Sequence, residues 1–455
     1  TLSGPGRIAA PAAPARGKRR EGMILSEHER FHYETVDEIR AEAAALGVDL
    51  AFDEDLSPLA APVRVGTREI ANALAIHPME GCDGDSQGRP GKLTLRRYER
   101  FAAGGAGLLW VEATAVVPEG RANPRQLWLH EKNKDSFRAM VEMIRQAAAE
   151  ANGPKHKPVM VLQLTHSGRY SKPEGAVYPI IPQRDPYRDP LIPQQKPNPD
   201  RSSRIPDDWP LVTDEYLDKL QDAYVKAARL AFEVGFDAVD IKSCHGYLIN
   251  ELFACHKRKG KYGGSFENRT RFVFEVTDKI RNQLGEKGAV VTRLGVYDAI
   301  PYPYGWAVNK KDYTKPDLTE PKKLIGLLQQ HGVNLVNVTI ANPYYNPHIG
   351  RPFNETIVGG YEEPEHPLTG VGRLVNITGE IQKEFPDLAI VGTGYSWLRT
   401  LFANVGAANK ANGMTTLIGA GRMAFAYPDF AKDIITKGRM YPEKVCVSCS
   451  ACTQI

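Results

Sequence analysis

Short apolar runs rich in β-branched residues recur along the chain from about residue 56 onward. Each run ends in small or polar residues, and amphipathic stretches with apolar residues at helical spacing separate most of them. Eight runs are predicted to be strands: residues 70–79, 107–114, 158–166, 236–243, 289–296, 333–340, 388–394 and 415–422. This alternation is typical of βα units that build a parallel sheet.

Eight βα units in series predict an α/β protein of the (β/α)8 TIM-barrel type, and they favour it over a doubly wound open sheet. Two long Pro-rich stretches with little helical pattern, roughly 171–211 and 341–370, follow the third and sixth strands. We expect them to be insertions above the carboxyl ends of the strands, where such loops usually cover a site.

The two ends of the chain differ from the barrel pattern. Residues 1–55 are predicted to be an extension, with a flexible tail over residues 1–22 and a short amphipathic helix over 35–47. The barrel is expected over residues 56–440, followed by a Cys-rich segment, 441–455. The sequence starts at Thr1 rather than at Met and stops three residues after Cys452, so either end is open to truncation.

The composition excludes several protein classes. A chain of 455 residues, 42% hydrophobic and 25% charged, can bury a large core. Its net charge of +4 is too weak to indicate nucleic acid or membrane binding. No apolar run reaches the roughly 18 residues of a membrane-spanning helix, and the first residues lack the apolar centre of a secretory signal. We expect a soluble, cytoplasmic protein, with a homo-oligomer left open.

Polar residues stand at the ends of all eight predicted strands. Any strand must turn polar where it reaches solvent, but amides, acids, imidazoles, a phenol and guanidiniums on one face favour an active site. The last two strands end in IVGTG and LIGAGR, and paired glycines at these positions let backbone N–H groups approach a phosphate. The sequence therefore predicts a site for a phosphorylated cofactor or substrate.

The chain resembles the old yellow enzyme family of FMN-dependent oxidoreductases, and most closely its branch of dienoyl-CoA reductases and trimethylamine dehydrogenase. The resemblance covers about residues 56–455. It rests on the motifs HPMEG, GGAGLLWVEAT, VLQLTHSGR, HGYLINELF, KYGGSFENRTRF, VTRLGV, VGTG, GAGR and CVSCSAC.

The resemblance implies FMN as the cofactor and NAD(P)H as the reductant. Met79 and Glu80 would lie beside the flavin, Gln163 would bond its pyrimidine edge, and Arg293 would face the negative charge of the reduced ring. The implied phosphate site is Gly394, Gly421 and Arg422. The rest of the implied cofactor-binding set is Pro78, Glu112 and Gly392.

The resemblance also implies a reaction, the reduction of an activated C=C bond in a small unsaturated substrate such as an enone, enoate or enoyl thioester. His245 and Lys242 would hold the substrate carbonyl oxygen, and Tyr247 would give a proton to the α-carbon.

Lys242 and Glu80 depart from the family pattern. Lys242 could polarise the substrate, or it could be structural and pair with Glu80 or Glu112. A strand-end lysine beside a phosphate site also suits a Schiff-base aldolase. Two further functions stay open, namely amine oxidation of the dehydrogenase type and ligand binding by a barrel without catalysis.

Three cysteines, Cys446, Cys449 and Cys452, are spaced C-x-x-C-x-x-C at the end of the chain. This spacing matches the beginning of the iron–sulfur motif of the branch, whose fourth cysteine would follow about a dozen residues later. We predict ligands of a [4Fe–4S] cluster, with a remnant of such a motif as the second interpretation.

Overall fold

A computed structural model of the chain describes residues 30–191, 205, 208–285, 289–355 and 363–453. The predicted flexible tail, residues 1–22, lies outside these ranges. No helix within them is long and apolar enough to cross a membrane.

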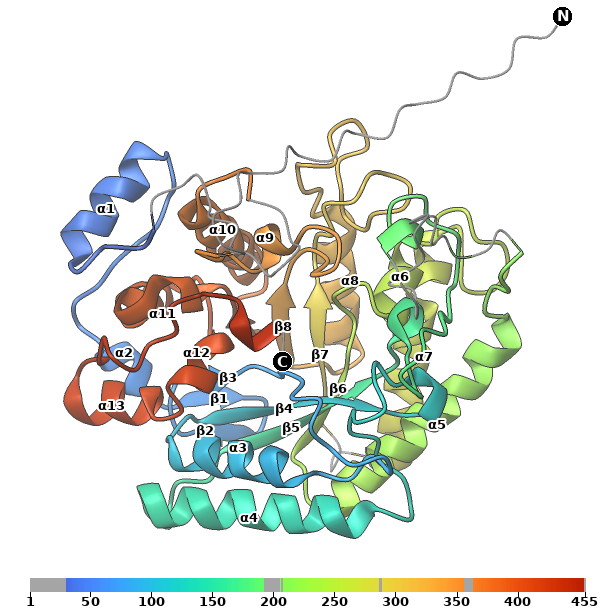
Figure 1. Cartoon of the computed structure of the whole chain (residues 1–455), viewed down its shortest axis with the longest axis horizontal. Coiled ribbons are helices and arrows are strands. Elements are labelled where there is room, and N and C mark those ends of the chain that lie inside the picture. The colour runs from blue at the N-terminus through green and yellow to red at the C-terminus, as the bar shows by residue number, and fades with distance from the viewer. Residues whose placement is uncertain (1–29, 192–204, 206–207, 286–288, 356–362, 454–455) are drawn as a thin grey trace, which may run out of the picture.

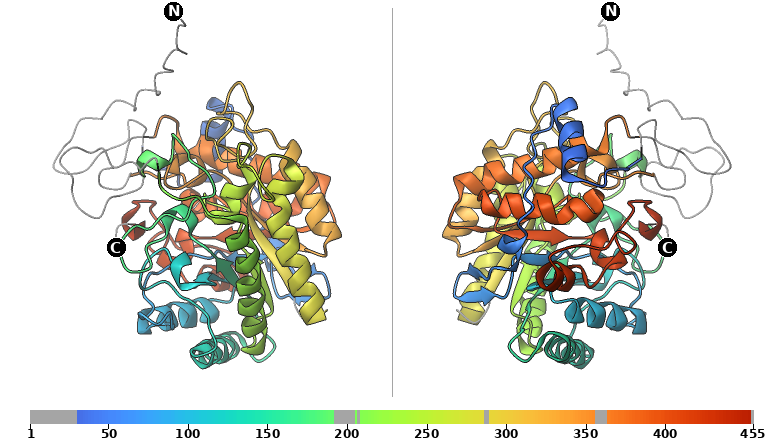
Figure 2. Two further views of the ribbon diagram at one scale, coloured as in Figure 1. Left: turned by 90° about the vertical axis from the view of Figure 1, so that its right-hand side faces the viewer. Right: turned by 90° about the vertical axis from the view of Figure 1, so that its left-hand side faces the viewer.

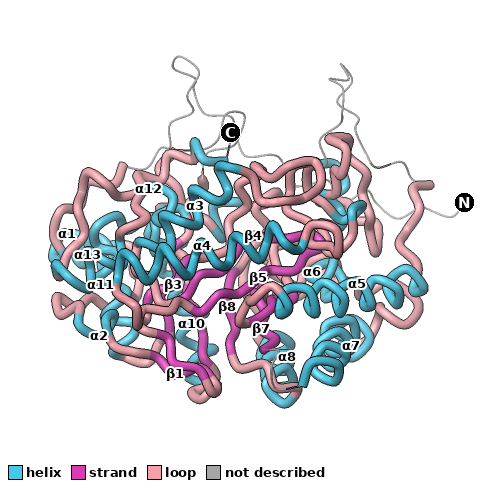
Figure 3. The backbone as a smooth tube through the Cα atoms, turned by 90° about the horizontal axis from the view of Figure 1, so that it is seen from below, coloured by secondary structure: helices cyan, strands magenta, loops and turns pink. Residues whose placement is uncertain are grey.

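Eight parallel strands close into a barrel, in the order β10-β3-β4-β5-β6-β7-β8-β9. Figure 3 shows the strands enclosed by helices. The predicted (β/α)8 barrel is confirmed, and every predicted strand overlaps one observed barrel strand, seven of them containing it in full. The strands are β3 Leu74–Ile76, β4 Leu108–Ala115, β5 Val159–Thr165, β6 Ala238–Ile241, β7 Ala289–Gly295, β8 Leu335–Thr339, β9 Ala389–Gly392 and β10 Leu417–Ala420.

Helices follow each strand and form the outer layer (Figure 1). Figure 2 shows two of the long ones, α5 and α7, side by side on the outside of the barrel. The helices after the barrel strands are α3 Lys92–Ala103, α4 Lys134–Asn152, α5 Asp214–Glu233, α6 Leu248–Phe253, α7 Phe266–Leu284, α8 Thr319–Gln330, α9 Pro347–Gly350, α10 Pro367–Glu384, α11 Phe402–Ala411, α12 Arg422–Ala426 and α13 Phe430–Lys437.

The helix predicted near the N-terminus is observed as α1, Val36–Ala45, and a short α2, Ser57–Ala60, leads into the barrel. Thr35 caps α1 because its hydroxyl accepts from the backbone N–H of Glu38, whose carboxylate accepts from the backbone N–H of Thr35. The segment after α1 is held on the barrel by Asn376 of α10, which donates to the carbonyl of Asp49.

An antiparallel hairpin, β1 Val63–Val65 with β2 Arg68–Ile70, precedes the first barrel strand and was not predicted. Val63, Val65 and Ile70 pack with the side chains that fill the amino-terminal end of the barrel, among them Trp110. The interior of the barrel is therefore a packed core at this end, and the space for chemistry lies at the other.

Long loops follow β5 and β8, as predicted, and a third one, residues 296–318, follows β7. The third loop is tied to the barrel by Trp306, whose indole N–H donates to the carbonyl of Gly295 at 2.9 Å. The loops after β5 and β8 touch each other through Tyr170 and Tyr344, whose rings stack with centroids 3.8 Å apart.

A buried network of charges anchors the loop after β5. Arg169 donates to Glu251 of α6 at 2.5 Å and also pairs with Asp189. Arg188 pairs with Asp185 and lies 3.1 Å from Glu251. The side chains of Arg169, Arg188 and Glu251 are fully buried, so each charge depends on its partners for solvation.

Candidate active site

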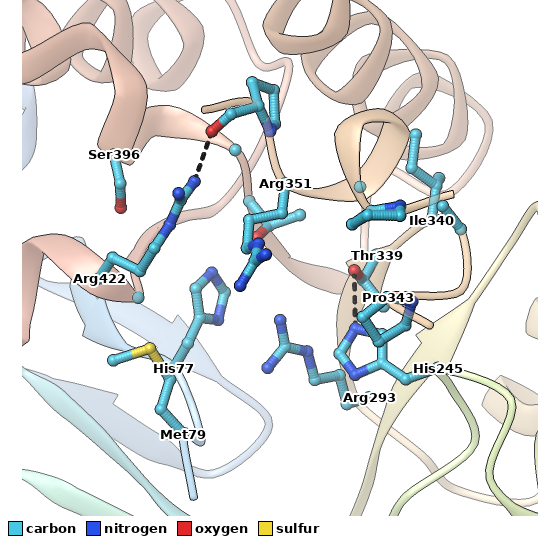
Figure 4. Close-up of a pocket in the computed structure, with 17 residues that line it drawn as sticks. His77, Met79, His245, Arg293, Thr339, Ile340, Pro343, Arg351, Ser396 and Arg422 are labelled. Carbon is cyan, nitrogen blue, oxygen red and sulfur yellow. Dashed lines mark hydrogen bonds between the residues drawn. The ribbon is translucent and has the colours of Figure 1, made fainter. Parts of the chain in front are cut away.

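A cavity of about 720 Å³, counting the part open to solvent, lies at the carboxyl ends of the barrel strands (Figure 4). Residues that follow β3, β8, β9 and β10 line it, together with Arg293 of β7 and His245 after β6. The lining residues are His77, Met79, His245, Arg293, Thr339, Ile340, Ala341, Pro343, Pro347, Gly350, Arg351, Pro352, Thr393, Gly394, Ser396, Gly421 and Arg422.

Three guanidinium groups converge on this cavity. All three line it, and Figure 4 shows Arg293 and Arg351 pointing toward the same space as the ring of His77, while Arg422 extends toward the carbonyl of Pro352. Arg293 is 7% exposed and donates to the carbonyl of Pro78 at 3.3 Å, and Arg422 donates to the carbonyl of Pro352 at 2.7 Å. The buried Nε of Arg293 and Nη1 of Arg422 have no hydrogen-bond partner among the described residues. Buried donors of this kind favour an anionic ligand.

Two glycines in the wall stand where a side chain would crowd neighbouring residues. A Cβ at Gly421 would lie 3.3 Å from the sulfur of Met79, and one at Gly394, where φ is +102°, would lie 2.7 Å from Leu374. These glycines, the hydroxyls of Thr393 and Ser396, Arg422 and Met79 lie at one end of the cavity, while Arg293 lies at the other. The residues present therefore fit FMN: the donors after β9 and β10 would take its phosphate, and Arg293 would face the flavin.

His245 stands where β6 gives way to α6, with a left-handed φ of 64°. Its Nε2 lies 3.3 Å from the hydroxyl of Thr339. Burial, followed by the charges of Arg293 and Lys242, holds the pKa of His245 well below its usual value, so the imidazole is neutral. A neutral imidazole in this position can donate a hydrogen bond to a ligand oxygen.

Tyr247, at the N-cap of α6, belongs to a second cluster. Its hydroxyl lies 3.3 Å from Oε1 of Glu80 and 3.2 Å from the hydroxyl of Tyr344. The Nζ of Lys242 lies 3.4 Å from the same Glu80 oxygen and 3.7 Å from the centre of the Tyr247 ring. Burial, and then the charge of Glu80, raise the pKa of Tyr247 well above its usual value, so the phenol keeps its proton.

Glu80 and Glu112 are the two carboxylates expected as possible partners of Lys242. Lys242 contacts Glu80 and not Glu112, and it is not among the residues that line the cavity with His245.

Three other predicted cofactor ligands have protein partners. The amide of Gln163 donates to Asp240 at 2.6 Å in the barrel interior. Glu112 accepts from Arg97 and from the backbone N–H of Gly81, and burial raises its pKa to about 7. At Gly392 a Cβ would meet the hydroxyl of Tyr395 at 2.8 Å. None of the three lines the cavity, so their role toward FMN stays a prediction.

The Cys-rich segment packs beside the phosphate end of the cavity. Asn354 binds it, through bonds to the carbonyls of Val447 and Ser448. Burial lowers the pKa of Arg422. Cys446, Cys452 and Cys449 lie close enough to act on this pKa in the opposite direction. However, no three His, Cys, Asp or Glu side chains in the described ranges are grouped so that they could hold a metal ion. The arrangement therefore gives the predicted [4Fe–4S] cluster no support.

Several lining residues had no signal in the sequence that assigned them to the site. Arg351 comes from the loop after β8, which carries no motif. Thr393 and Ser396 flank the glycine of IVGTGYS, and only their position after a predicted strand pointed to them.

Comparison with protein families gives one match over more than half of the chain. Residues 58–307 match the model of the NADH:flavin oxidoreductase / NADH oxidase family. Among similar curated proteins, an NADPH dehydrogenase of Geobacillus sp. (strain WCH70) is 29% identical over 66% of this chain and 79% of its own length.

Solved structures share the fold at low sequence identity. A 2-naphthoyl-CoA reductase is 18% identical with a TM-score of 0.66, over 87% of this chain and 54% of its own. A histamine dehydrogenase from Rhizobium sp. 4-9 is 19% identical with a TM-score of 0.62, over 88% of this chain and 50% of its own. The chain thus spans about half the length of these two proteins.

Proposed function

Because the chain belongs to the NADH:flavin oxidoreductase / NADH oxidase family, the old yellow enzyme family of NAD(P)H-dependent FMN oxidoreductases, we propose that it reduces an activated C=C bond. The substrate would be a small enone, enoate or enoyl thioester. One observation carries the proposal. A neutral His245 lines a cavity that fits FMN, and a protonated Tyr247 follows it by two residues at the N-cap of α6.

Each residue of the site has a separate role in the proposed reaction. FMN, held by Arg293 at the flavin and by Gly394, Gly421 and Arg422 at the phosphate, supplies hydride transfer when bound. His245 donates a hydrogen bond to the carbonyl oxygen of the substrate, which favours the build-up of negative charge there. Tyr247 then gives its proton to the α-carbon. Arg293, a buried cation, would stabilise negative charge on the flavin ring system of FMN.

Amine oxidation is less well supported, although one similar structure is a histamine dehydrogenase. A substrate ammonium needs an aromatic face or a carboxylate to bind. Here Lys242 places its own ammonium 3.7 Å above the Tyr247 ring and 3.4 Å from Glu80. A second cation would be repelled from this position.

A Schiff-base aldolase is also disfavoured. Its lysine must attack as a neutral amine. Lys242 instead contacts Glu80 and the face of the Tyr247 ring, and it is not among the residues that line the cavity.

The function is tested by anaerobic half-reactions. The purified protein is expected to show the absorbance of oxidised flavin, to lose it on addition of NADH or NADPH, and to regain it when an enone or an enoyl thioester is added. If an amine bleaches the flavin and no alkene reoxidises it, amine oxidation becomes the better-supported function and alkene reduction the weaker one. A colourless protein that binds no FMN would refute both functions.

Arg422→Met is expected to weaken FMN binding by about 10- to 150-fold, because a charge-assisted hydrogen bond is worth about 1.5–3 kcal/mol. Titration of the apoprotein with FMN, followed by flavin fluorescence, measures the effect. Arg399→Met is a matched control, since the Arg399 guanidinium lies over the Phe31 ring at 4.8 Å and does not line the cavity. Equal losses in both variants would argue against a phosphate site at Arg422.

A further inference from the structure

Glu80 and Lys242, the two residues that depart from the family pattern, contact each other in the structure. They come from the ends of β3 and β6, and one oxygen of Glu80 lies within 3.4 Å of both the Lys242 ammonium and the Tyr247 hydroxyl. The two departures therefore form one unit with the proposed proton donor.

The side chains of Glu80, Lys242 and Tyr247 differ in their exposure to solvent. Tyr247 is 5% exposed, and its hydroxyl is covered by Tyr344 on one side. The Lys242 side chain is 6% exposed, whereas that of Glu80 is 18% exposed. Among these three side chains, Glu80 has the best access to solvent.

We propose that Glu80 is the relay that returns a proton to Tyr247 after each turnover, and that Lys242 is a positioning residue for both. This inference rests on the proposed function, in which Tyr247 gives its proton to the α-carbon of the alkene. The Tyr247 O–H bond breaks and a C–H bond forms, which leaves a phenolate. Glu80 takes a proton from a solvent water molecule, which leaves as hydroxide to the bulk, and passes it to the phenolate oxygen, so that both residues return to their starting states and each turnover consumes one solvent proton.

Electrostatics favour this direction of transfer. A phenolate at Tyr247 would face the Glu80 carboxylate across 3.3 Å, and two negative charges at this distance in a buried site repel each other strongly. Protonation of Glu80 relieves the repulsion, and its proton then moves to the stronger base, because the pKa of Tyr247 is raised well above its usual value.

Other charged and titratable groups around Glu80 have different roles. The Lys242 ammonium lies over the ring of Tyr247 and fixes its plane. Tyr344 shares a hydrogen bond with Tyr247 and stacks on Tyr170. The thiol of Cys82 accepts from Asn123, and burial, followed by the charge of Glu80, raises its pKa to about 12. At neutral pH, Cys82 is therefore not a competing acid.

The test separates the first turnover from those that follow. Tyr247 starts protonated both in wild-type protein and in Glu80→Gln. One equivalent of alkene added to the prereduced variant should therefore reoxidise its flavin no more than about threefold more slowly than in wild type, and faster where the lost Glu80 charge had opposed the phenolate. Steady-state turnover of Glu80→Gln should fall at least about tenfold, as expected for a lost proton-transfer group.

Chemical rescue provides the second readout. Formate or acetate added to Glu80→Ala should restore steady-state turnover in proportion to the acid concentration and leave the first turnover unchanged. Lys242→Met should slow the first turnover, because the ring is no longer held, and carboxylic acids should not rescue it. Lys242→Arg should recover part of the rate.

Two outcomes would overturn the relay. A Glu80→Gln variant with unchanged steady-state turnover, or one that slows equally in the first and later turnovers without rescue by acids, would leave Glu80 with a structural role only. Failure of every alkene to reoxidise the wild-type flavin would instead refute the proposed function. The two failures are therefore distinguishable.

Discussion

Tyr247→Phe is expected to slow reoxidation of the reduced flavin by an alkene about 10²- to 10⁴-fold, the range typical for the loss of a general acid. The ring of phenylalanine keeps the contact with Lys242, and only the hydroxyl that bonds Glu80 and Tyr344 is lost. Reduction of the flavin by NAD(P)H does not use this proton, so its rate should change little. Stopped-flow absorbance of the two half-reactions measures both rates.

Tyr344→Phe is the matched control for this experiment. It removes the other hydroxyl of the same hydrogen bond from a residue that is 44% exposed. We expect a change of less than about tenfold, in line with the loss of one partly exposed hydrogen bond. Equal slowing of both half-reactions in Tyr247→Phe would contradict a role as proton donor, because it would point to a disturbed flavin site.

Arg169→Met is expected to lower the free energy of unfolding by about 3–5 kcal/mol, the usual cost of leaving a buried charge without its partner. Glu251 would keep its pair with Arg188, and Asp189 would lose its buried partner and keep the more exposed Arg184. Denaturation in urea, followed by fluorescence or circular dichroism, measures the difference.

A surface arginine serves as the control for Arg169. Arg229 pairs with Glu131 and Glu233, but its side chain is 40% exposed, so Arg229→Met should cost no more than about 1 kcal/mol. A similar cost in both variants would show that burial of the network adds nothing to stability. Arg169→Met should also reduce alkene turnover, since Glu251 is one helical turn from Tyr247 and its N–H donates to the carbonyl of Tyr247.

The barrel could be predicted because each strand carries its own local signal. A run such as PVMVLQLTH is apolar, β-branched and polar only at its end, so its place in a parallel sheet follows from a short window of residues. The hairpin β1–β2 was missed because each of its strands has only three residues, too few to establish an alternating pattern beside the turn at Gly66 and Thr67.

The partners of the site residues could not be predicted in the same way. Lys242 was open to three roles, because the residue that contacts it, Glu80, lies 162 positions away on another strand. Likewise, nothing near Glu112 in the sequence indicates that Arg97, on the preceding helix, occupies its carboxylate. Local patterns place a side chain at the end of the barrel, but its neighbours depend on the register and curvature of the closed sheet.

The stack of Tyr170 on Tyr344 has a consequence for engineering. It joins the loops after β5 and β8 beside Tyr247, and Asn342 strengthens the join by donating to the hydroxyl of Tyr170 at 3.2 Å. A graft that replaced one loop with that of a relative would leave an aromatic face without its counterpart and would release Tyr344 from the hydroxyl of Tyr247. Substrate range should therefore be altered by exchanging the two loops together, as a single cassette.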